Sequence, residues 1–141
     1  MVQDFTKRLS IIIDKSLPSW KAMNTAAHIA AYFGHQFTEN FGTGDFFNTK
    51  DGINLPRNTQ YPIIVFAGEH DAVQTFAKVV KDINDIQVMY FTNEMIESTD
   101  DAEIQKITTQ KNFDEVVILG VGIFGEHSII KGLTKKFKLW S

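Results

Sequence analysis

The sequence predicts an α/β fold, a three-layer α/β/α domain with a mixed, roughly four-stranded sheet. Four short runs are rich in β-branched and aromatic residues, and amphipathic helical patterns lie between them. Two of the runs are almost continuously apolar, which is typical of strands covered on both faces. With 141 residues, of which 43% are hydrophobic, the chain is long enough for one core. We therefore predict a single domain over residues 1–141.

The predicted strands are bounded by turn-forming or charged residues. We expect them at residues 10–13, 61–67, 86–92 and 115–121. The second contains Ile-Ile-Val-Phe and the fourth Val-Val-Ile-Leu, which indicates that both lie inside the sheet.

Four helices are predicted in the intervening segments. We expect them from Pro18 to Gly34, from Asp71 to near Ile83, from about Asp100, and from about Glu126 to Leu133. Gln74 and Glu103 each stand three residues after an aspartate, the spacing of a capping box. The segment from Gly34 to Gln60 follows neither period and is too long for an ordinary connection. It either contains a short strand or acts as a lid.

The amino-acid composition and the absence of certain motifs exclude several classes of functional site. The chain has no cysteine, which removes disulfides, thiolate nucleophiles and zinc thiolate sites. Its four histidines show no paired metal-ligand spacing, and no G-x-S-x-G nucleophile motif occurs. We predict no metal and no cofactor. No apolar run is long enough to span a membrane, and Met1–Phe5 lacks the order of a signal peptide. We expect a cytoplasmic protein with no membrane partner.

Charge argues against a general nucleic-acid binder. Seventeen acidic and fourteen basic residues give a net charge of -3, whereas non-specific phosphate binding usually needs a basic excess. A local excess of basic residues occurs only in the tail, which contains Lys131, Lys135, Lys136, Lys138 and Trp140. This tail is either a basic patch or a solvated helix end whose lysines oppose the helix dipole.

Gly120–Gly125 spells G-x-G-x-x-G between a predicted strand and a predicted helix. Only sixteen residues follow it, so the second strand and acidic ribose ligand of a dinucleotide site have no room. We expect instead a tight turn whose exposed N–H groups could hold an anion.

The first predicted helix carries a polar stripe beside its apolar face. Ala22, Ala26, Ile29, Ala30 and Phe33 project inward, and Lys21, Thr25, His28 and Tyr32 form the neighbouring stripe. Such a stripe can border a cleft or lie on the surface. His28 is either a structural histidine or a site residue.

Residues 21–30, Lys-Ala-Met-Asn-Thr-Ala-Ala-His-Ile-Ala, resemble the first-helix signature of type II peptidyl-tRNA hydrolases. Thr134–Leu139 is similar to the closing Thr-Gly-His-Leu-Lys-Leu of that family. A closer resemblance is to DUF2000, a family of unknown function within that superfamily. The shared features are Leu17-Pro18, the Asn24–His28 helix, and an Asp51-Gly52 loop before an Ile-Pro-rich strand.

The resemblance implies a cleft between the first helix, the loop after the third strand and the Gly120–Gly125 turn. The candidate catalytic residues are Lys21, His28, Asp100 and Asp101, and the candidate ligand-binding residues are Asn24, Thr25, Thr99, Gly122, Gly125 and Thr134. Lysine could stabilise an oxyanion and histidine could act as base. The aspartates could orient that base or a water, but N-capping is an equally simple role for them.

Two departures from the hydrolases affect the expected function. Thr25 replaces their glutamine, and the Asp-Ala-Gly-x-Thr motif is absent around residues 97–102. One hypothesis is an ester hydrolase acting on a tRNA-linked or related substrate. The other is a non-catalytic module that binds a small molecule or protein in the same cleft. An enzyme should bring Lys21, His28 and a carboxylate to one point.

By analogy with the hydrolases, we also expect a homodimer.

Overall fold

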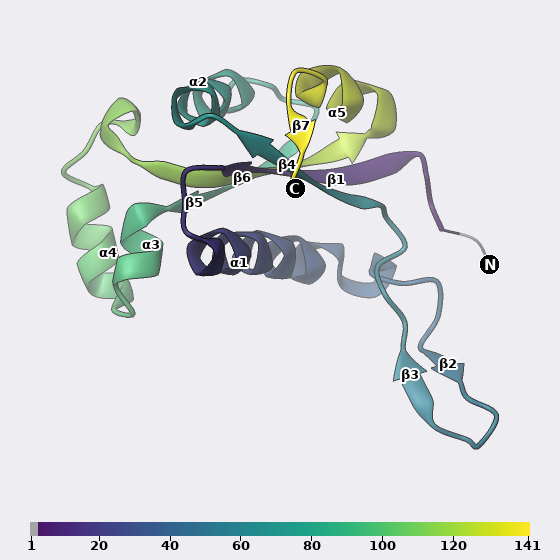
Figure 1. Ribbon diagram of the computed structural model, residues 1–141. Helices are drawn as coiled ribbons and strands as arrows, with labels where there is room; N and C mark the ends of the chain where they lie inside the picture. The colour runs from purple at the N-terminus through teal and green to yellow at the C-terminus, as the bar shows by residue number, and fades with distance from the viewer. Residues whose placement is uncertain (1–2) are drawn as a thin grey trace.

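The computed structural model describes residues 3–141, and Met1 and Val2 of the predicted domain lie outside the described residues (Figure 1). Its main sheet has five strands in the order β5-β6-β1-β4-β7. The bounds are β1 Lys7–Asp14, β4 Ile63–Gly68, β5 Gln87–Thr92, β6 Ile118–Glu126 and β7 Lys138–Leu139. The central strand β1 pairs parallel with β4 and antiparallel with β6. The mixed α/β class is confirmed.

The sheet has one strand more than predicted. The additional strand, β7, has two residues and pairs antiparallel with Phe66 and Ala67 of β4. A two-residue strand is too short to show an alternating pattern, because that period needs four or more positions. Only the packing of the tail against β4 creates it.

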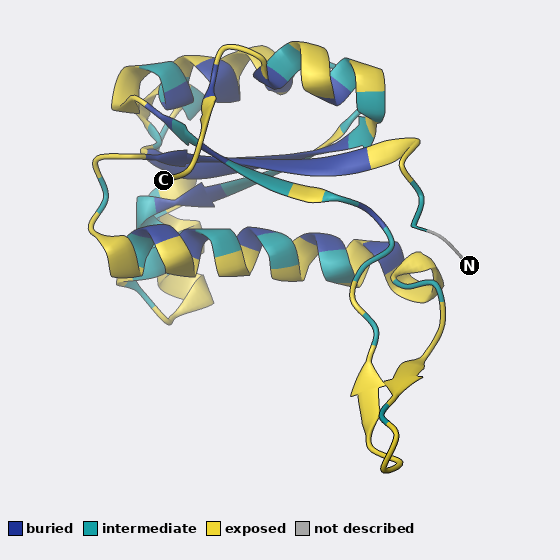
Figure 2. Ribbon diagram, turned by 45° about the vertical axis from the view of Figure 1, so that its right-hand side comes forward, coloured by how far each residue is buried: buried dark blue, intermediate teal, exposed yellow. Residues whose placement is uncertain are grey.

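Helices lie against both faces of the sheet. Figure 1 shows α1 (Ser19–Phe37) on one face and α2 (His70–Val80) and α5 (His127–Thr134) on the other. Alternate residues of β1 therefore enter two separate cores. Ile11 packs in the cluster that contains Phe33 of α1, and Ile12 packs in the cluster that contains Phe76 of α2. In Figure 2 the sheet-facing sides of the helices are buried and their outer sides are exposed.

The Gly120–Gly125 segment is not a turn, so that prediction was wrong. All six residues lie inside β6, which pairs with β1 on one side and β5 on the other. A Cβ at Gly122 would overlap the side chains of Ile29 and Phe33. Glycine here lets α1 approach the sheet closely. The helix begins only at His127, so these N–H groups form no anion site at a helix start.

Helix boundaries differ from the prediction where tertiary contacts replace local ones. The N-cap of α2 is Glu69 rather than Asp71. The Gln74 side chain bonds the backbone N–H and C=O of Ile118, at 3.0 and 2.7 Å, instead of completing a capping box. Gln74 thus ties α2 to the start of β6. A short helix that was not predicted, α3 (Asn93–Glu97), precedes α4 (Asp101–Thr108).

The irregular segment contains two short strands, the first of the two alternatives. Helix α1 continues past Gly34 to Phe37, and the 3-10 turn η1 (Thr38–Asn40) follows. Then β2 (Phe46–Asn48) and β3 (Asn54–Pro56) form a hairpin whose turn contains Gly52 at φ 89°. Figure 1 shows this hairpin projecting away from the sheet. A second 3-10 turn, η2 (Phe113–Glu115), leads into β6. None of the described helices is long and apolar enough to cross a membrane.

Candidate functional site

A cleft of about 560 Å³, the helical cleft, is formed by α1, β5, α3, α4 and the loop between the last two. Its lining residues are Asn24, His28, Met89, Phe91, Met95, Ile96, Ser98, Thr99, Asp101 and Ile104. Of the predicted first-helix stripe only His28 lines the cleft, together with Asn24 of the same helix. The loop after the third predicted strand contributes Ser98 and Thr99. The third predicted wall, Gly120–Gly125, does not.

His28 forms part of an aromatic wall in this cleft. Its ring stacks on Phe91 with centroids 4.9 Å apart and planes 15° from parallel. His28 is exposed although Phe91 is buried, so one face of the imidazole is open. Among residues 3–141, the side chains of Asn24, His28 and Asp101 make no hydrogen bond to another group. Their polar atoms are therefore available to a ligand.

Lys21 does not join this group. Its Nζ lies 5.5 Å from the centroid of the Trp20 ring, and Lys21 does not line the cleft. His28 follows seven residues later, which places the two Cα atoms about 10 Å apart along the helix. Within residues 3–141 Lys21 makes no ion pair with a carboxylate. The predicted combination of lysine, histidine and carboxylate is not assembled.

Thr25 has a packing role instead of the predicted ligand-binding one. Its side chain is fully buried, and Oγ1 donates a hydrogen bond of 2.7 Å to the carbonyl of Lys21. Its methyl group faces Gly120, where an added Cβ would lie 2.6 Å away. Burial between α1 and β6 keeps Thr25 out of the cleft.

The two aspartates separate into different roles. Oδ1 of Asp100 accepts hydrogen bonds from the N–H groups of Ala102 and Glu103 at 2.9 and 3.4 Å. Asp100 is thus the N-cap of α4, the structural alternative for this residue. Ser98 completes the cap, because its Oγ accepts from Asp100 N–H and donates to Glu103. Asp101 lies in the first turn of α4 and lines the cleft with Thr99.

The remaining predicted ligand-binding residues lie elsewhere. Gly122 is buried beneath α1, and Gly125 pairs with Arg8 in the sheet. Thr134 lies on the opposite face, where its Oγ1 donates to the Ile130 carbonyl at 2.9 Å. None of the three lines the helical cleft. The predictions for Gly122 and Gly125 assumed a turn before α5, where β6 in fact continues, and the prediction for Thr134 came from the resemblance to the closing motif of the hydrolases.

A partly buried ion pair connects α3 to the segment after α4, on the side of the cleft opposite α1. Lys111 Nζ lies 2.6 Å from Glu94 Oε1, with side-chain exposures of 30% and 11%. Burial raises the pKa of Glu94. The hydrogen bond from Lys111 lowers it, as do hydrogen bonds with the backbone and Thr92, and together they bring the pKa of Glu94 below its ordinary value. The ion pair therefore holds these two short helices together.

A second polar cluster, which the sequence interpretation missed, lies where β1 and β4 end. His70 Nδ1 is 2.7 Å from Asp14 Oδ2, although the residues are 56 positions apart in the chain. The Asp14 side chain is 2% exposed and that of His70 is 49% exposed. Parallel pairing places Asp14 opposite Gly68, which brings the start of α2 beside the end of β1. In open α/β sheets ligands bind at the carboxyl ends of the strands.

Hydrogen bonds surround the Asp14 carboxylate. Oδ1 accepts from the Ser16 N–H at 2.9 Å and from the Ser16 hydroxyl at 2.6 Å. Burial raises the pKa of Asp14, but the hydrogen bonds from Ser16 and His70 together outweigh burial and bring the pKa below its ordinary value. Asp14 is therefore ionised near neutrality, and its Oδ2 accepts a hydrogen bond from the protonated Nδ1 of His70.

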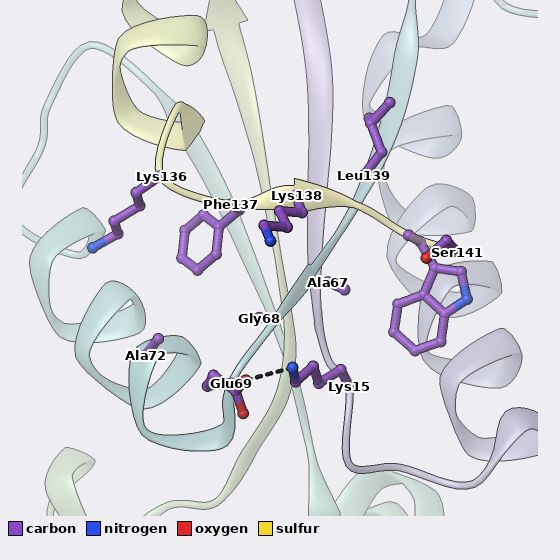
Figure 3. Close-up of a pocket in the computed structure, with 11 residues that line it drawn as sticks. Lys15, Ala67, Gly68, Glu69, Ala72, Lys136, Phe137, Lys138, Leu139 and Ser141 are labelled. Carbon is purple, nitrogen blue, oxygen red and sulfur yellow. Dashed lines mark ion pairs between the residues drawn. The ribbon is translucent and has the colours of Figure 1, made fainter.

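Beside this cluster is a second cavity, the strand-end pocket, of about 510 Å³ (Figure 3). Gly68 at the end of β4 and Glu69, the N-cap residue of α2, line it, together with Lys15, which directly follows Asp14. The other side is formed by the tail, with Phe137, Lys138 and Trp140 among its lining residues. Figure 3 shows Lys15 and Lys138 on either side of Gly68, with a dashed ion pair from Lys15 to Glu69.

Two of the tail lysines lie at a solvated helix end and two line a cavity, so each of the two interpretations of the tail applies to part of it. Lys131 lies in the last turn of α5 and Lys135 is its C-cap, positions that oppose the helix dipole. Lys136 lies over the Phe137 ring, 5.3 Å from its centroid, and lines the strand-end pocket with Lys138. Only the second pair therefore contributes charge to a cavity.

A comparison with solved structures found one protein with a similar fold, and its low sequence identity supports similarity of fold only. A protein of unknown function from Agrobacterium tumefaciens strain C58 superimposes with a TM-score of 0.82 and 20% sequence identity. The match covers 98% of this chain and 100% of that one. The comparison with curated proteins gave no match.

The family comparison extends over almost the whole chain. Residues 7–141 match DUF2000, a family described as a protein of unknown function. This range includes all the main-sheet strands, both cavities and the Asp14–His70 pair. The chain therefore belongs to the DUF2000 family of proteins of unknown function.

Proposed function

We propose that this chain binds a small, largely apolar molecule in the helical cleft. The observation that carries the proposal is the composition of the lining. Five of its ten lining residues, Met89, Phe91, Met95, Ile96 and Ile104, are apolar, and apolar atoms make up most of the lining surface. A volume of about 560 Å³ falls within the usual range for small-molecule sites.

The charge of the cleft narrows the class of ligand. Asp101 is the one charged side chain in the lining, and no lysine or arginine lines the cleft. An anionic group would meet this carboxylate without a compensating cation. We therefore propose a neutral or cationic ligand with a planar ring that stacks beside His28 and Phe91.

Binding is better supported here than ester hydrolysis. Hydrolysis in this cleft was expected to use Lys21 for the oxyanion, and Lys21 contacts Trp20 instead. A tRNA-linked substrate would also bring phosphates towards Asp101. Asn24, His28, Thr99 and Asp101 thus remain proposed ligand contacts rather than catalytic groups.

The finer fold assignment is also a proposal. A three-layer, type II peptidyl-tRNA hydrolase-like arrangement is supported by α1 on one face of the sheet and by α2 and α5 on the other. The cytoplasmic location and the homodimer stay predictions from the sequence.

Methionine methyl groups provide a direct test of ligand binding. Met89 and Met95 line the helical cleft, whereas Met23 does not. In methyl NMR with a library of planar aromatic amines and amides, we expect the Met89 and Met95 signals to shift. Met23 lines a separate cavity beside Trp140, so its signal reports binding outside the helical cleft.

Substitution of the aromatic wall gives a matched comparison. His28→Ala should weaken binding of such a ligand about 2- to 10-fold, the usual contribution of one aromatic contact. His35→Ala, an exposed histidine on the same helix, should leave affinity unchanged. Shifts confined to Met23, or equal affinity in the two variants, would contradict the proposal.

A further inference from the structure

The Asp14–His70 pair has the features of a general base and is independent of the helical cleft. The carboxylate is buried and fully hydrogen-bonded, and it holds Nδ1 of a ring that is half exposed. Within residues 3–141, Nε2 of His70 has no hydrogen-bond partner. A carboxylate on Nδ1 selects the tautomer with its proton there, which leaves Nε2 as a free acceptor.

We propose that Asp14 and His70 activate water for the hydrolysis of a small ester that carries a negative charge. Nε2 of His70 takes a proton from water while the water oxygen bonds to the ester carbonyl carbon. The tetrahedral intermediate then collapses, and the bond from carbon to the alcohol oxygen breaks. The departing alkoxide takes the proton from Nε2, so a carboxylic acid and an alcohol leave and His70 is neutral again. Asp14 acts as a positioning residue.

The class of substrate is inferred from the strand-end pocket, whose lining includes the chain neighbours of both residues but neither Asp14 nor His70 itself. Glu69, which precedes His70, and Lys15, which follows Asp14, both line this pocket. Three lysines and one glutamate contribute to the lining, and Glu69 is paired with Lys15. Lys138 makes no ion pair within residues 3–141, and its ammonium group faces the pocket in Figure 3. An anionic group beside Lys138 and an apolar part against Phe137 and Trp140 match this lining.

A purely structural role for the pair makes a different prediction. If Asp14 served only to tie α2 to β1, the state of Nε2 would be irrelevant and its loss would affect stability alone. Nitrogen NMR of the imidazole rings tests whether Nε2 is free to act as the base, and the turnover of the variants separates the two roles. We expect neutral His70 to carry its proton on Nδ1. A proton on Nε2 would overturn the proposal.

Turnover is tested with 4-acetoxybenzoate, an anionic acetyl ester, and with its neutral methyl ester. The wild-type chain should cleave the anionic ester at least about 10²-fold faster than the same concentration of free imidazole, the lower range for general-base catalysis. His70→Gln should reduce the rate to the imidazole background, and His35→Gln should not. Asp14→Asn, with folding verified by circular dichroism, should lower kcat for the anionic ester and leave KM nearly unchanged, because Asp14 positions the base and does not bind the substrate.

Substrate charge is tested separately at Lys138. Lys138→Gln should remove the preference for the anionic over the neutral ester, while Lys131→Gln, on the outside of α5, should keep it. A wild-type rate no greater than that of imidazole, or an unchanged rate in His70→Gln, would overturn the general-base assignment. Equal cleavage of both esters by the wild type would overturn the assigned substrate class.

Discussion

At the scale of single residues, environment decides which titratable groups can act. Asp14 is more deeply buried than any other charged side chain among residues 3–141 and still ionises, because Ser16 and His70 donate to both its oxygens. Asp100 is also a carboxylate beside a helix, but its oxygen is occupied by the N–H groups of α4. The two residues look alike in the sequence and differ in which donors surround them.

The lowered pKa of Asp14 gives a prediction for acid stability. A carboxyl whose pKa is lower in the folded than in the unfolded chain contributes stability above its ordinary value of 3.8. That contribution is lost as pH falls through the lower folded value. We expect the free energy of unfolding of Asp14→Asn to depend less on pH between about 4 and 2 than that of the wild type. Urea titrations across this range measure it, with Asp101→Asn as the exposed control. Parallel pH profiles for wild type and Asp14→Asn would contradict the pKa direction.

At the scale of elements, the contact between α1 and β6 determines the shape of the domain. Gly120 and Gly122 lie where Thr25, Ile29 and Phe33 of α1 meet the strand. Without side chains on β6 at these positions, the apolar stripe of α1 packs directly on the sheet. The same close approach places Asn24 and His28 at the border of β5, where the helical cleft opens.

A pair of glycine substitutions tests this packing. Gly122→Ala would place a Cβ into Ile29 and Phe33, and we expect it to destabilise the fold by about 1–3 kcal/mol. Gly132 lies in α5 with nothing within 4 Å of an added Cβ. Gly132→Ala should therefore stabilise the chain by about 0.5–1 kcal/mol through helix propensity. Chemical denaturation of both variants measures the difference, and similar effects in the two would contradict the packing argument.

At the scale of the whole molecule, the hairpin of β2 and β3 stands apart from the two cores. All six of its strand residues are exposed, and none belongs to either core cluster (Figure 2). Both cavities with candidate chemistry lie elsewhere, at α1, α3 and α4 or at the strand ends. We therefore expect the fold to be independent of the hairpin.

Shortening the hairpin tests that independence. The N–H of Arg57 bonds the carbonyl of Asp45 at 3.2 Å, so an Asn-Gly turn can replace residues 46–56. We expect the free energy of unfolding to change by less than about 1 kcal/mol, as for other changes to exposed surface. Thermal and urea denaturation of the shortened chain check this. A larger loss of stability would mean that the hairpin packs on the body of the protein.

Much of the fold follows from local sequence pattern. Strand runs with apolar residues on both faces, the stripe of α1 and the cap at Asp100 are short-range features, and the structure contains all three. The helical cleft was predicted in part, because four of the candidate site residues, Asn24, His28, Thr99 and Asp101, line it, whereas Lys21 and Thr25 of the predicted stripe do not. The two-residue strand β7 and the continuation of β6 through Gly125 carry no local period, so the sequence interpretation missed them.

What the sequence determined by itself is the α/β class and the side of each element that faces the core, because these depend on periods of two and 3.6 residues. What only the tertiary structure decided is which polar groups meet. Lys21 and His28 share a helix yet lie two turns apart, whereas Asp14 and His70 are 56 residues apart in the chain and in contact. Parallel pairing of β1 with β4 creates that contact, and the register between distant strands is set by packing of the whole sheet rather than by either segment alone.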